Sequence, residues 1–399
     1  MGGKNHEGGY LTDTIILASL EPSTEKVALI SIPRDLTVPV EDMGWRKINN
    51  INAFAEVANP GSGGMAVSQA ISDILEIPID YYVRLDFEGF INIIDELGGL
   101  EIEVENTLDD YSYPVMGKED AYPYESRFEH LHIEKGWQTM DGDLALKYVR
   151  SRHAVGVEGS DFARARRQQL LLSAIKDEVL SMHVIFKPTM ISKVIDQVEE
   201  HVATNFKIWE LVKLWGMFKN IKKENVINKV LNNDANGLLV QSITDDGAYI
   251  LIPKSGDFSE IKYMVNTVFQ QAPLDAKTQV VGEMATIEVR NGTWINGLAS
   301  KMAVDLEKLG FLVVRIGNSS RQNFQKSVIY DLTSGEKTKS LAILKDITKA
   351  NVALSVPDWL QEDITVEIEH EKNPVRPDFI LVLGQDADST QSGKENAAN

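Results

Sequence analysis

The amino-acid sequence predicts an α/β protein with more than one domain. Its 399 residues are enough for two or three domains of ordinary size. Short β-rich segments alternate with segments whose apolar residues recur at helical spacing, which is the order of elements in an α/β fold. With 43% hydrophobic and 25% charged residues, the composition is that of a globular protein rather than a disordered one.

The first predicted elements are a β-hairpin and two helices. Residues 14–20 and 27–32 are rich in β-forming residues, and the turn between them contains Pro22. Apolar residues at helical spacing predict helices over residues 64–75 and 87–97.

The second of these helices has both of its ends marked. Asp86 is placed to cap its N-terminus, and Gly98 and Gly99 allow the chain to leave in a left-handed conformation. Strands are expected on either side, at residues 82–85 and 101–104.

Residues 106–130 are rich in Asp, Tyr and Pro and lack apolar periodicity, so a long loop or lid is predicted there. Helices are then expected to begin at Asp141 and Asp161. The remaining elements of this part are expected as helices at residues 189–202, 207–220 and 257–269 and strands at residues 238–243 and 249–252.

A linker at residues 273–284 is expected to divide a first domain, residues 1–272, from a second, residues 285–386. The second domain is predicted to contain strands at residues 286–289, 311–316, 328–330, 364–368 and 379–383 and helices at residues 297–309 and 337–348. That order predicts a small α/β domain with right-handed crossovers. Residues 387–399 are polar and are predicted to be disordered.

Charge and composition exclude several function classes. A net charge of −19 repels the phosphates of DNA and of an anionic membrane surface, so an anionic ligand requires a local basic cluster. The absence of cysteine removes disulfides, thiol nucleophiles and thiolate metal sites. The sequence has no run of about 18 apolar residues, and no zinc-protease or P-loop motif.

Basic side chains gather in three motifs of this acidic protein. Arg34 closes an apolar strand, at the edge where open α/β sheets bind ligands. Arg150 and Arg152 are two residues apart, so an extended chain would direct both to one side. Arg164 and Gln168 are four apart and share one face of a helix. Because guanidinium groups bind phosphate oxygens in a bidentate manner, these residues could together hold a pyrophosphate.

Each of these residues also has a simpler interpretation. Asp13 could hold Mg²⁺ at the front of the first strand, but a turn residue or a cap explains a lone aspartate better. Arg34 and Asp35 could form a surface ion pair of little consequence, and His153 could be structural. A solvated helix face accounts for the three arginines that follow Asp161: Arg164, Arg166 and Arg167.

Six segments occur in an order that resembles a LytR-CpsA-Psr (LCP) domain. They are TDTIILASL, SIPRDLTV, the KIN of residues 47–49, IDYYVRLDFEGFINIIDELGGLEIEV, MDGDLALKYVRSRH and SDFARARRQQ, and they cover about residues 11–180. The resemblance implies an LCP-type α-β-α sandwich with a central mixed sheet. Residues 285–385 resemble the LytR-type C-terminal α/β domain that follows in many members.

The resemblance also implies a function and a set of site residues. It implies a phosphotransferase that moves a glycopolymer from a polyprenyl-pyrophosphate carrier to a cell-wall acceptor. The family motif places Mg²⁺ on Asp13 and the phosphate-binding side chains on Arg34, Arg150, Arg152, Arg164 and Gln168. Asp35 and Lys47 are expected to complete the substrate-binding set.

The polyprenyl tail of the carrier lies in an apolar tunnel in this family. The candidate tunnel residues, which a plain core explains equally well, are Val67, Ile71, Phe87, Phe90 and Ile91. Family members also carry a G-x-D-x-R strand, with a second aspartate, and a membrane anchor before the motif at Asp13. We expect both to be missing from this chain. The family's membrane anchor implies a location on the extracytoplasmic face of the bacterial cell membrane.

Two other functions stay open from the sequence: hydrolysis of the pyrophosphate by water, and a non-catalytic wall-binding or lipid-binding module. The expected partners are a polyprenyl-pyrophosphate-linked glycan, a peptidoglycan or other wall acceptor, and a membrane. Nucleic acid is not expected as a partner, because the chain is acidic and lacks a basic recognition helix.

Overall fold

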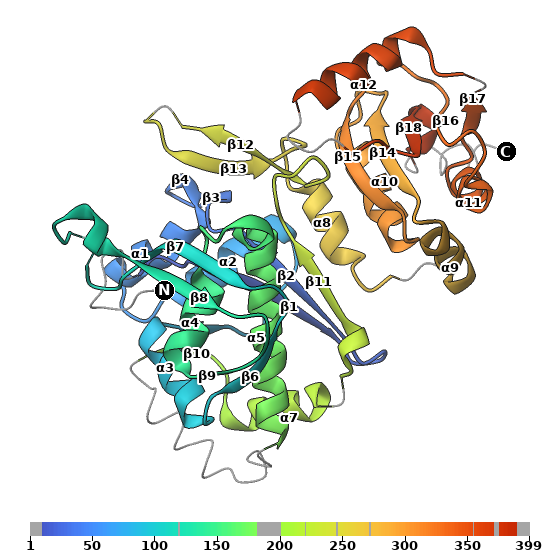
Figure 1. The fold of residues 1–399 in the computed structure, drawn as a ribbon. Helices are drawn as coiled ribbons and strands as arrows, with labels where there is room; N and C mark the ends of the chain where they lie inside the picture. The colour runs from blue at the N-terminus through green and yellow to red at the C-terminus, as the bar shows by residue number, and fades with distance from the viewer. Residues whose placement is uncertain are drawn as a thin grey trace. The chain divides into compact units, whose positions relative to one another are not determined.

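The computed structural model describes residues 10–118, 120–181, 201–219, 221–244, 246–270, 273–353, 355–370 and 375–388. The chain forms two compact units, which Figure 1 shows as a ribbon. The first unit contains residues 1–231 and 243–251, and the second contains residues 232–242 and 252–399. No helix of the described residues is both long enough and apolar enough to cross a membrane.

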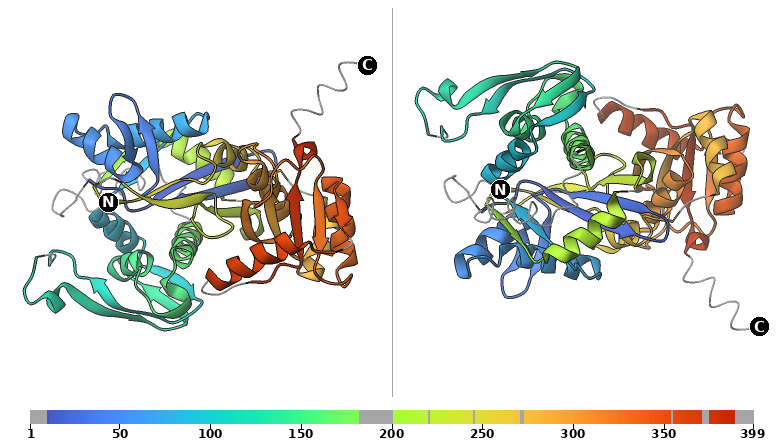
Figure 2. Two further views of the ribbon diagram at one scale, coloured as in Figure 1. Left: turned by 90° about the horizontal axis from the view of Figure 1, so that it is seen from above. Right: turned by 90° about the horizontal axis from the view of Figure 1, so that it is seen from below.

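A mixed three-stranded sheet with the order β1-β2-β11 lies in the first unit. Its strands are β1 (Ile15–Glu21), β2 (Lys26–Ile32) and β11 (Val226–Val230). The first two strands form the predicted antiparallel hairpin, and β11 joins β2 in parallel. Figure 2 shows this sheet between the blue helices α1 (Ile48–Ala58) and α2 (Gly63–Leu75) on one face and the green α5 (Asp161–Ser181) on the other. The predicted layered arrangement around a mixed sheet is therefore confirmed.

The first unit also contains four two-stranded antiparallel sheets. They are β3 (Thr37–Val40) with β4 (Gly44–Lys47), β5 (Val83–Leu85) with β10 (Val202–Thr204), β6 (Leu100–Val104) with β9 (Gly136–Met140), and β7 (Leu108–Pro114) with β8 (Phe128–Ile133). The other helices of the unit are α3 (Phe87–Glu96), α4 (Gly142–Arg150) and α7 (Ile208–Phe218). The helix expected at residues 189–202 lies outside the described residues up to residue 200.

The predicted ends of α3 and the predicted start of α4 are confirmed. The Asp86 carboxylate accepts a hydrogen bond from the Gly89 backbone N–H at 2.8 Å, and Asp141 accepts one from Leu144 at 2.8 Å. Each carboxylate thus satisfies a backbone donor that has no partner within its helix. Gly98, with φ of 85°, leaves α3 in the expected left-handed conformation.

The prediction of a long loop over residues 106–130 is wrong, because much of this segment is the β7–β8 hairpin. The inward positions of β7 include Leu108, Asp110 and Tyr113, all of which are buried. A buried carboxylate at one of these positions hides the alternation of apolar and polar residues that marks a strand. The Asp110 carboxylate is satisfied there by the Ser151 hydroxyl, which donates a hydrogen bond to it at 2.7 Å.

The second unit has a five-stranded sheet with the order β15-β14-β18-β16-β17. Its strands are β14 (Thr286–Asn291), β15 (Leu312–Asn318), β16 (Val328–Asp331), β17 (Asn351–Ala353) and β18 (Phe379–Leu383). The helices are α8 (Ser259–Asn266), α9 (Leu274–Glu283), α10 (Leu298–Lys308), α11 (Thr338–Thr348) and α12 (Asp358–His370). A further two-stranded sheet pairs β12 (Leu239–Ile243) with β13 (Tyr249–Pro253), and residues 243–251 of this segment belong to the first unit.

The central strand β18 is buried on both faces, as expected for a sheet between layers of helices. Phe379 and Leu381 pack in a cluster with α10 and α11, whereas Ile380 and Val382 pack with Leu360 of α12. The predicted small α/β domain is confirmed in its strands β14, β15, β16 and β18 and its helices α10 and α11.

Two expectations for this part of the chain are wrong. The strand expected at residues 364–368 lies within α12, because Leu360 and Ile364 are one helical turn apart and pack on the same cluster. That tertiary contact outweighs the β-branched residues of the segment. The expected linker at residues 273–284 contains the helix α9, whose Val280 is fully buried. The predicted disordered tail lies outside the described residues from residue 389 onward.

Candidate functional site

A pocket of about 740 Å³ in the first unit collects most of the polar residues that the sequence motifs single out. Six of them line it: Asp13, Arg34, Arg150, Arg152, Arg164 and Gln168. Its four arginines outnumber its three carboxylates, those of Asp13, Glu125 and Glu129. This acidic protein therefore has a local basic cluster, as an anionic ligand requires.

Asp13 and Arg34 are brought together by the β1–β2 hairpin. Ile15 pairs with Ile32, so the same register places residue 13 opposite residue 34, just beyond the strand ends. The Arg34 Nη1 donates a hydrogen bond to Asp13 Oδ1 at 2.5 Å. Burial acts to raise the pKa of Asp13, but this hydrogen bond and the charges of Arg34 and Arg152 outweigh it and hold the pKa below its ordinary value. Asp13 is thus an ionised carboxylate in the pocket.

Arg150 is the last residue of α4, and its guanidinium group stacks over the ring of Phe87 at 4.1 Å. Its Nη1 is buried and, within the described part of the chain, has no hydrogen-bond partner. A buried donor without a partner costs free energy, and a donor that carries charge costs more. The pocket therefore holds a guanidinium group whose hydrogen-bonding capacity an anion could satisfy.

Arg152, Arg164 and Gln168 reach the same pocket from two segments. Arg152 lies in the irregular chain after α4, and the other two lie one turn apart on α5. The Gln168 amide is buried and donates a hydrogen bond to the Thr14 hydroxyl at 3.1 Å. The predicted shared helix face is thus directed at the residues beside Asp13.

Arg167 is not part of a solvated face, contrary to that interpretation of the α5 arginines. Its side chain is only 2% exposed. It donates hydrogen bonds to the backbone oxygens of Tyr148 at 2.8 Å and Ser151 at 2.7 Å, and it pairs with the Glu158 carboxylate at 2.6 Å. Arg167 therefore holds the chain on both sides of Arg150. Arg166, by contrast, is 52% exposed and pairs with Glu105.

Asp110 is a second buried support that sequence reasoning missed. Its carboxylate accepts hydrogen bonds from the Ser151 hydroxyl and, at 3.2 Å, from the backbone N–H of His153. Arg152, the residue between these two, is thus held in place by the β7–β8 hairpin. No motif indicated this role, because the partners are more than 40 residues apart in the chain.

Asp35 and Lys47 do not line the pocket but pair with each other at 2.9 Å. The Asp35 carboxylate also lies 3.6 Å from Arg34 Nε, so Asp35 forms an ion pair with the Arg34 guanidinium group as well. The predicted tunnel residues do not line the pocket either, as far as the described residues extend. Ile71 and Phe87 are buried, and Val67, Phe90 and Ile91 are half-buried. Phe87 adjoins the pocket through its contact with Arg150.

The β7–β8 hairpin supplies one wall of the pocket, which the sequence motifs did not indicate. Its contribution is largely aromatic: Tyr111, Tyr113, Tyr124, Phe128 and His130. Tyr111 and Tyr124 are 64% and 62% exposed. Aromatic rings that present an apolar face beside a polar edge suit a ligand of mixed polarity.

Comparison with known proteins bears on the whole chain. Residues 3–267 match the sequence model of the LytR_cpsA_psr family. Residues 284–386 match a second model, described as LytR cell envelope-related transcriptional attenuator.

Two relatives illustrate the similarity. The chain is 25% identical over 360 residues to the cell wall biosynthesis protein LcpA of Corynebacterium glutamicum, which covers 83% of this chain and 64% of LcpA. It is 29% identical over 215 residues to the polyisoprenyl-teichoic acid–peptidoglycan teichoic acid transferase TagV of Bacillus subtilis, which covers 54% of this chain and 50% of TagV. The chain thus spans between half and two thirds of the length of these curated relatives.

Among solved structures, the B. subtilis TagV crystal structure covers 68% of this chain and 94% of its own, with 24% identity and a TM-score of 0.48. TagT of the same organism, bound to LI-WTA, covers 64% of this chain and 84% of its own, with 22% identity and a TM-score of 0.46.

Proposed function

Since this chain belongs to the LytR_cpsA_psr family, we propose that it transfers a glycopolymer from a polyprenyl-pyrophosphate carrier to a peptidoglycan acceptor. The name of TagV, a polyisoprenyl-teichoic acid–peptidoglycan teichoic acid transferase, supports this class of donor and acceptor. Action at the outer face of the cell membrane follows from the same proposal, because the acceptor lies there.

The arginine cluster is the observation that carries the proposal. Four guanidinium groups line one pocket, and the buried Nη1 of Arg150 has no hydrogen-bond partner among the described residues. A pyrophosphate offers several oxygens that accept bidentate hydrogen bonds from arginine. The aromatic wall that the β7–β8 hairpin supplies to the pocket is suited to the sugars attached to that pyrophosphate.

The reaction balances as a single displacement at phosphorus. A hydroxyl oxygen of the acceptor attacks the phosphorus that carries the glycan and forms a new P–O bond. The bond from that phosphorus to the bridging oxygen breaks, and polyprenyl phosphate leaves with the electron pair. The proton of the acceptor hydroxyl passes to the departing polyprenyl phosphate or to water. The arginines stabilise the negative charge on the phosphate oxygens, which is where most catalysis of phosphoryl transfer arises.

Asp13 is the residue that we propose to hold Mg²⁺. Mg²⁺ is commonly bound by one or two carboxylates together with substrate phosphates, and the lowered pKa of Asp13 keeps its carboxylate ionised. Asp13 lines the pocket beside the arginines, so this donor set fits the ion. When bound, Mg²⁺ would neutralise charge on the pyrophosphate. The same ionisation makes Asp13 a weak proton acceptor.

The test uses the full chain with a polyprenyl-pyrophosphate-linked glycan and purified peptidoglycan. Transfer predicts covalent glycan on the peptidoglycan together with free polyprenyl phosphate. Release of polyprenyl phosphate without attachment would mean that water is the acceptor, and binding without release would mean a non-catalytic module. A rate that EDTA leaves unchanged would contradict the role of Mg²⁺.

Two arginines of α5 provide a matched pair of variants. Arg164→Ala removes a pocket guanidinium, and loss of one preorganised donor costs about 2.7 to 4 kcal/mol, or about 10²- to 10³-fold in rate. Arg166→Ala removes the same charge two residues away, but Arg166 is half exposed, so an effect under about 1 kcal/mol is expected. Transfer rates at unchanged melting temperature are compared. Equal losses of transfer rate in the two variants would mean that α5 contributes diffuse positive charge and no specific pyrophosphate contact.

A further inference from the structure

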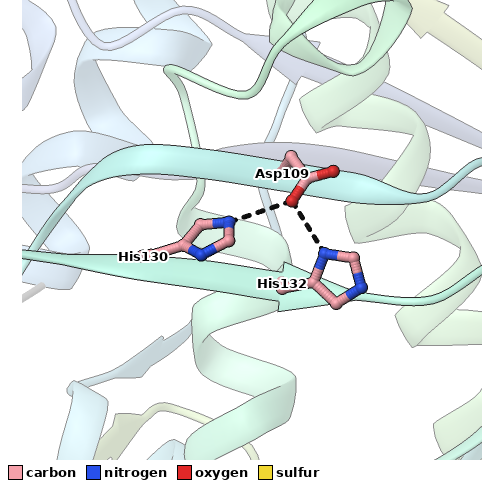
Figure 3. Close-up of side chains that lie close together, drawn as sticks. All are labelled: Asp109, His130 and His132. Carbon is pink, nitrogen blue, oxygen red and sulfur yellow. Dashed lines mark hydrogen bonds and ion pairs between the residues drawn. The ribbon is translucent and has the colours of Figure 1, made fainter.

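Three metal-ligating side chains converge on the outer face of the β7–β8 hairpin, as Figure 3 shows. Asp109 lies opposite His132 in the register of the two strands, and His130 is two residues before His132, on the same face of β8. The opposite face of the hairpin packs Leu108, Leu131 and Ile133 into the core. The hairpin thus fixes the backbone of a His-x-His pair and an aspartate facing it.

The ligand atoms are already close together. Asp109 Oδ1 lies 2.9 Å from His130 Nε2 and 2.7 Å from His132 Nδ1. In a tetrahedral zinc site with bonds of about 2.0 to 2.1 Å, neighbouring ligand atoms are about 3.3 Å apart. The three side chains are between 31% and 45% exposed, so small rotations about their side-chain bonds can open this space.

Two neighbours orient the histidine rings for metal binding. The Glu134 carboxylate lies 3.0 Å from His132 Nε2, so it can accept a hydrogen bond from Nε2–H and leave the Nδ1 lone pair for a cation. The ring of Tyr111 stacks on His130 with 4.2 Å between centroids and 5° between planes. A carboxylate behind a ligating histidine is a common feature of protein zinc sites.

We propose that Asp109, His130 and His132 form a binding site for a zinc-class divalent cation, with Glu134 as the outer partner of His132. Two imidazoles and a single carboxylate favour Zn²⁺ over Mg²⁺ or Ca²⁺, which prefer all-oxygen sites. With three protein ligands, a fourth coordination position is open for water or for a ligand group.

The site borders the arginine pocket, because His130 and Tyr111 also line that pocket. A cation held here is therefore placed to meet an oxygen of a pocket ligand through its open position. None of these three ligands is proposed to hold Mg²⁺, which is assigned to Asp13, so the zinc proposal and the magnesium proposal can fail independently.

The competing interpretation is a hydrogen-bonded cluster that binds protons and no metal. The hydrogen bonds that the Asp109 carboxylate accepts from the two histidines lower the pKa of Asp109, and the hydrogen bonds that the His132 ring donates to Asp109 and Glu134 raise the pKa of His132. Both effects arise in a simple ion-pair cluster as well as in a metal site without its ion. Measured affinity and stoichiometry must decide between them.

The experiment titrates the metal-free full chain with Zn²⁺ in competition with a chromophoric chelator. One equivalent is expected to bind, a millimolar excess of Mg²⁺ should not displace it, and Asp13→Asn should leave it unchanged. His132→Ala should abolish this binding, and Glu134→Gln should weaken it about 10- to 100-fold. Because ligands must be deprotonated, affinity should also fall as the pH is lowered.

His153→Ala is the matched control, since His153 is an exposed histidine of the same pocket outside the cluster. Its Zn²⁺ affinity should equal that of the parent. Circular dichroism and melting temperature without metal exclude misfolding of each variant. The proposal is overturned if the parent shows no stoichiometric binding, or if His130→Ala and His132→Ala bind Zn²⁺ as tightly as the parent.

Discussion

The arginines of α4 and α5 differ in what holds their guanidinium groups. Arg167 is enclosed by two backbone oxygens and the Glu158 carboxylate. Arg150 instead stacks on an aromatic ring, and its Nη1 has no hydrogen-bond partner among the residues that the structure describes. A donor whose hydrogen bonds are all made within the protein stabilises the fold, and one held in place but unsatisfied is available to a ligand. Arg167 thus supports the stability of the fold, and Arg150 is available for ligand binding.

Arg167→Ala should therefore lower stability. The change leaves the Glu158 carboxylate and the backbone oxygens of Tyr148 and Ser151 without their donor, and breaking a buried pair costs about 3 to 5 kcal/mol. Arg152→Ala, at a half-buried pocket residue, should lower transfer and cost less stability than Arg167→Ala. Urea denaturation of both variants compares the two residues. A stable Arg167→Ala protein would show that its hydrogen bonds are replaced by water.

The Asp13–Arg34 pair predicts a pH dependence of stability. Because the folded pKa of Asp13 lies below its ordinary value of 3.8, the pair stabilises the folded state above pH 3.8, and this contribution is lost as pH falls through the lower folded pKa. The stability difference between the parent and Asp13→Asn should be constant from neutral pH to about pH 5 and should shrink only in stronger acid. If this stability difference instead changed between pH 6 and 8, groups other than Asp13 would be responsible for the pH dependence.

At the scale of elements, the short helix α4 connects local sequence to the pocket. Its N-terminus is capped by Asp141, and its last residue is Arg150. Asp141→Ala should cost about 1 kcal/mol, within the range measured for loss of an N-cap. Asp141→Asn, which can still accept the hydrogen bond, should cost less. Thermal melts of the two variants test the cap, and equal losses would mean that the charge near the helix end matters more than the hydrogen bond.

The β7–β8 hairpin is the other element that shapes the site. Its inner face anchors the segment around Arg152 through Asp110, while its outer face and tip supply aromatic residues and the three metal-ligating side chains. One hairpin therefore links core packing, the arginine pocket and the proposed zinc site. Its two faces can serve separate purposes because successive side chains of a strand point in opposite directions.

At the scale of the whole molecule, the residues lining the pocket all lie between Asp13 and Gln168. A chain that ends near residue 275 should therefore keep lipid binding. It would retain α8 but lose α10, against which α8 packs within the second unit, so buried residues such as Ile261 and Met264 would become exposed. Lower solubility is expected together with intact binding.

Binding of a polyprenyl-pyrophosphate lipid, measured on the monomeric fraction of the truncated protein, tests this prediction. The parent chain is the control, and circular dichroism reports whether the remaining elements fold. Loss of binding in a folded monomer would show that residues beyond 275 contribute to the site.

The sequence by itself determined the elements whose signals are local and the motifs that mark the site. The β1–β2 hairpin, the caps at Asp86 and Asp141, and the glycine exit from α3 follow from neighbouring residues, and all are confirmed. The approach of Asp13 to Arg34 follows from the register of that hairpin, which the structure supplies. The expectation of an LCP-type fold rested on the order of six motifs, because no single motif was specific enough.

Only the tertiary structure decided which polar residues face the pocket and which are buried supports. Arg167 and Asp110 have partners far away in the chain, and residues 364–368 are helical because of packing on β18. The convergence of Asp109 with His130 and His132 depends on the β7–β8 hairpin. The sequence does not show this hairpin clearly, because the buried Asp110 interrupts the alternation of apolar and polar residues. Local sequence cannot specify such outcomes, because the free energy that decides them comes from long-range contacts formed when the chain folds.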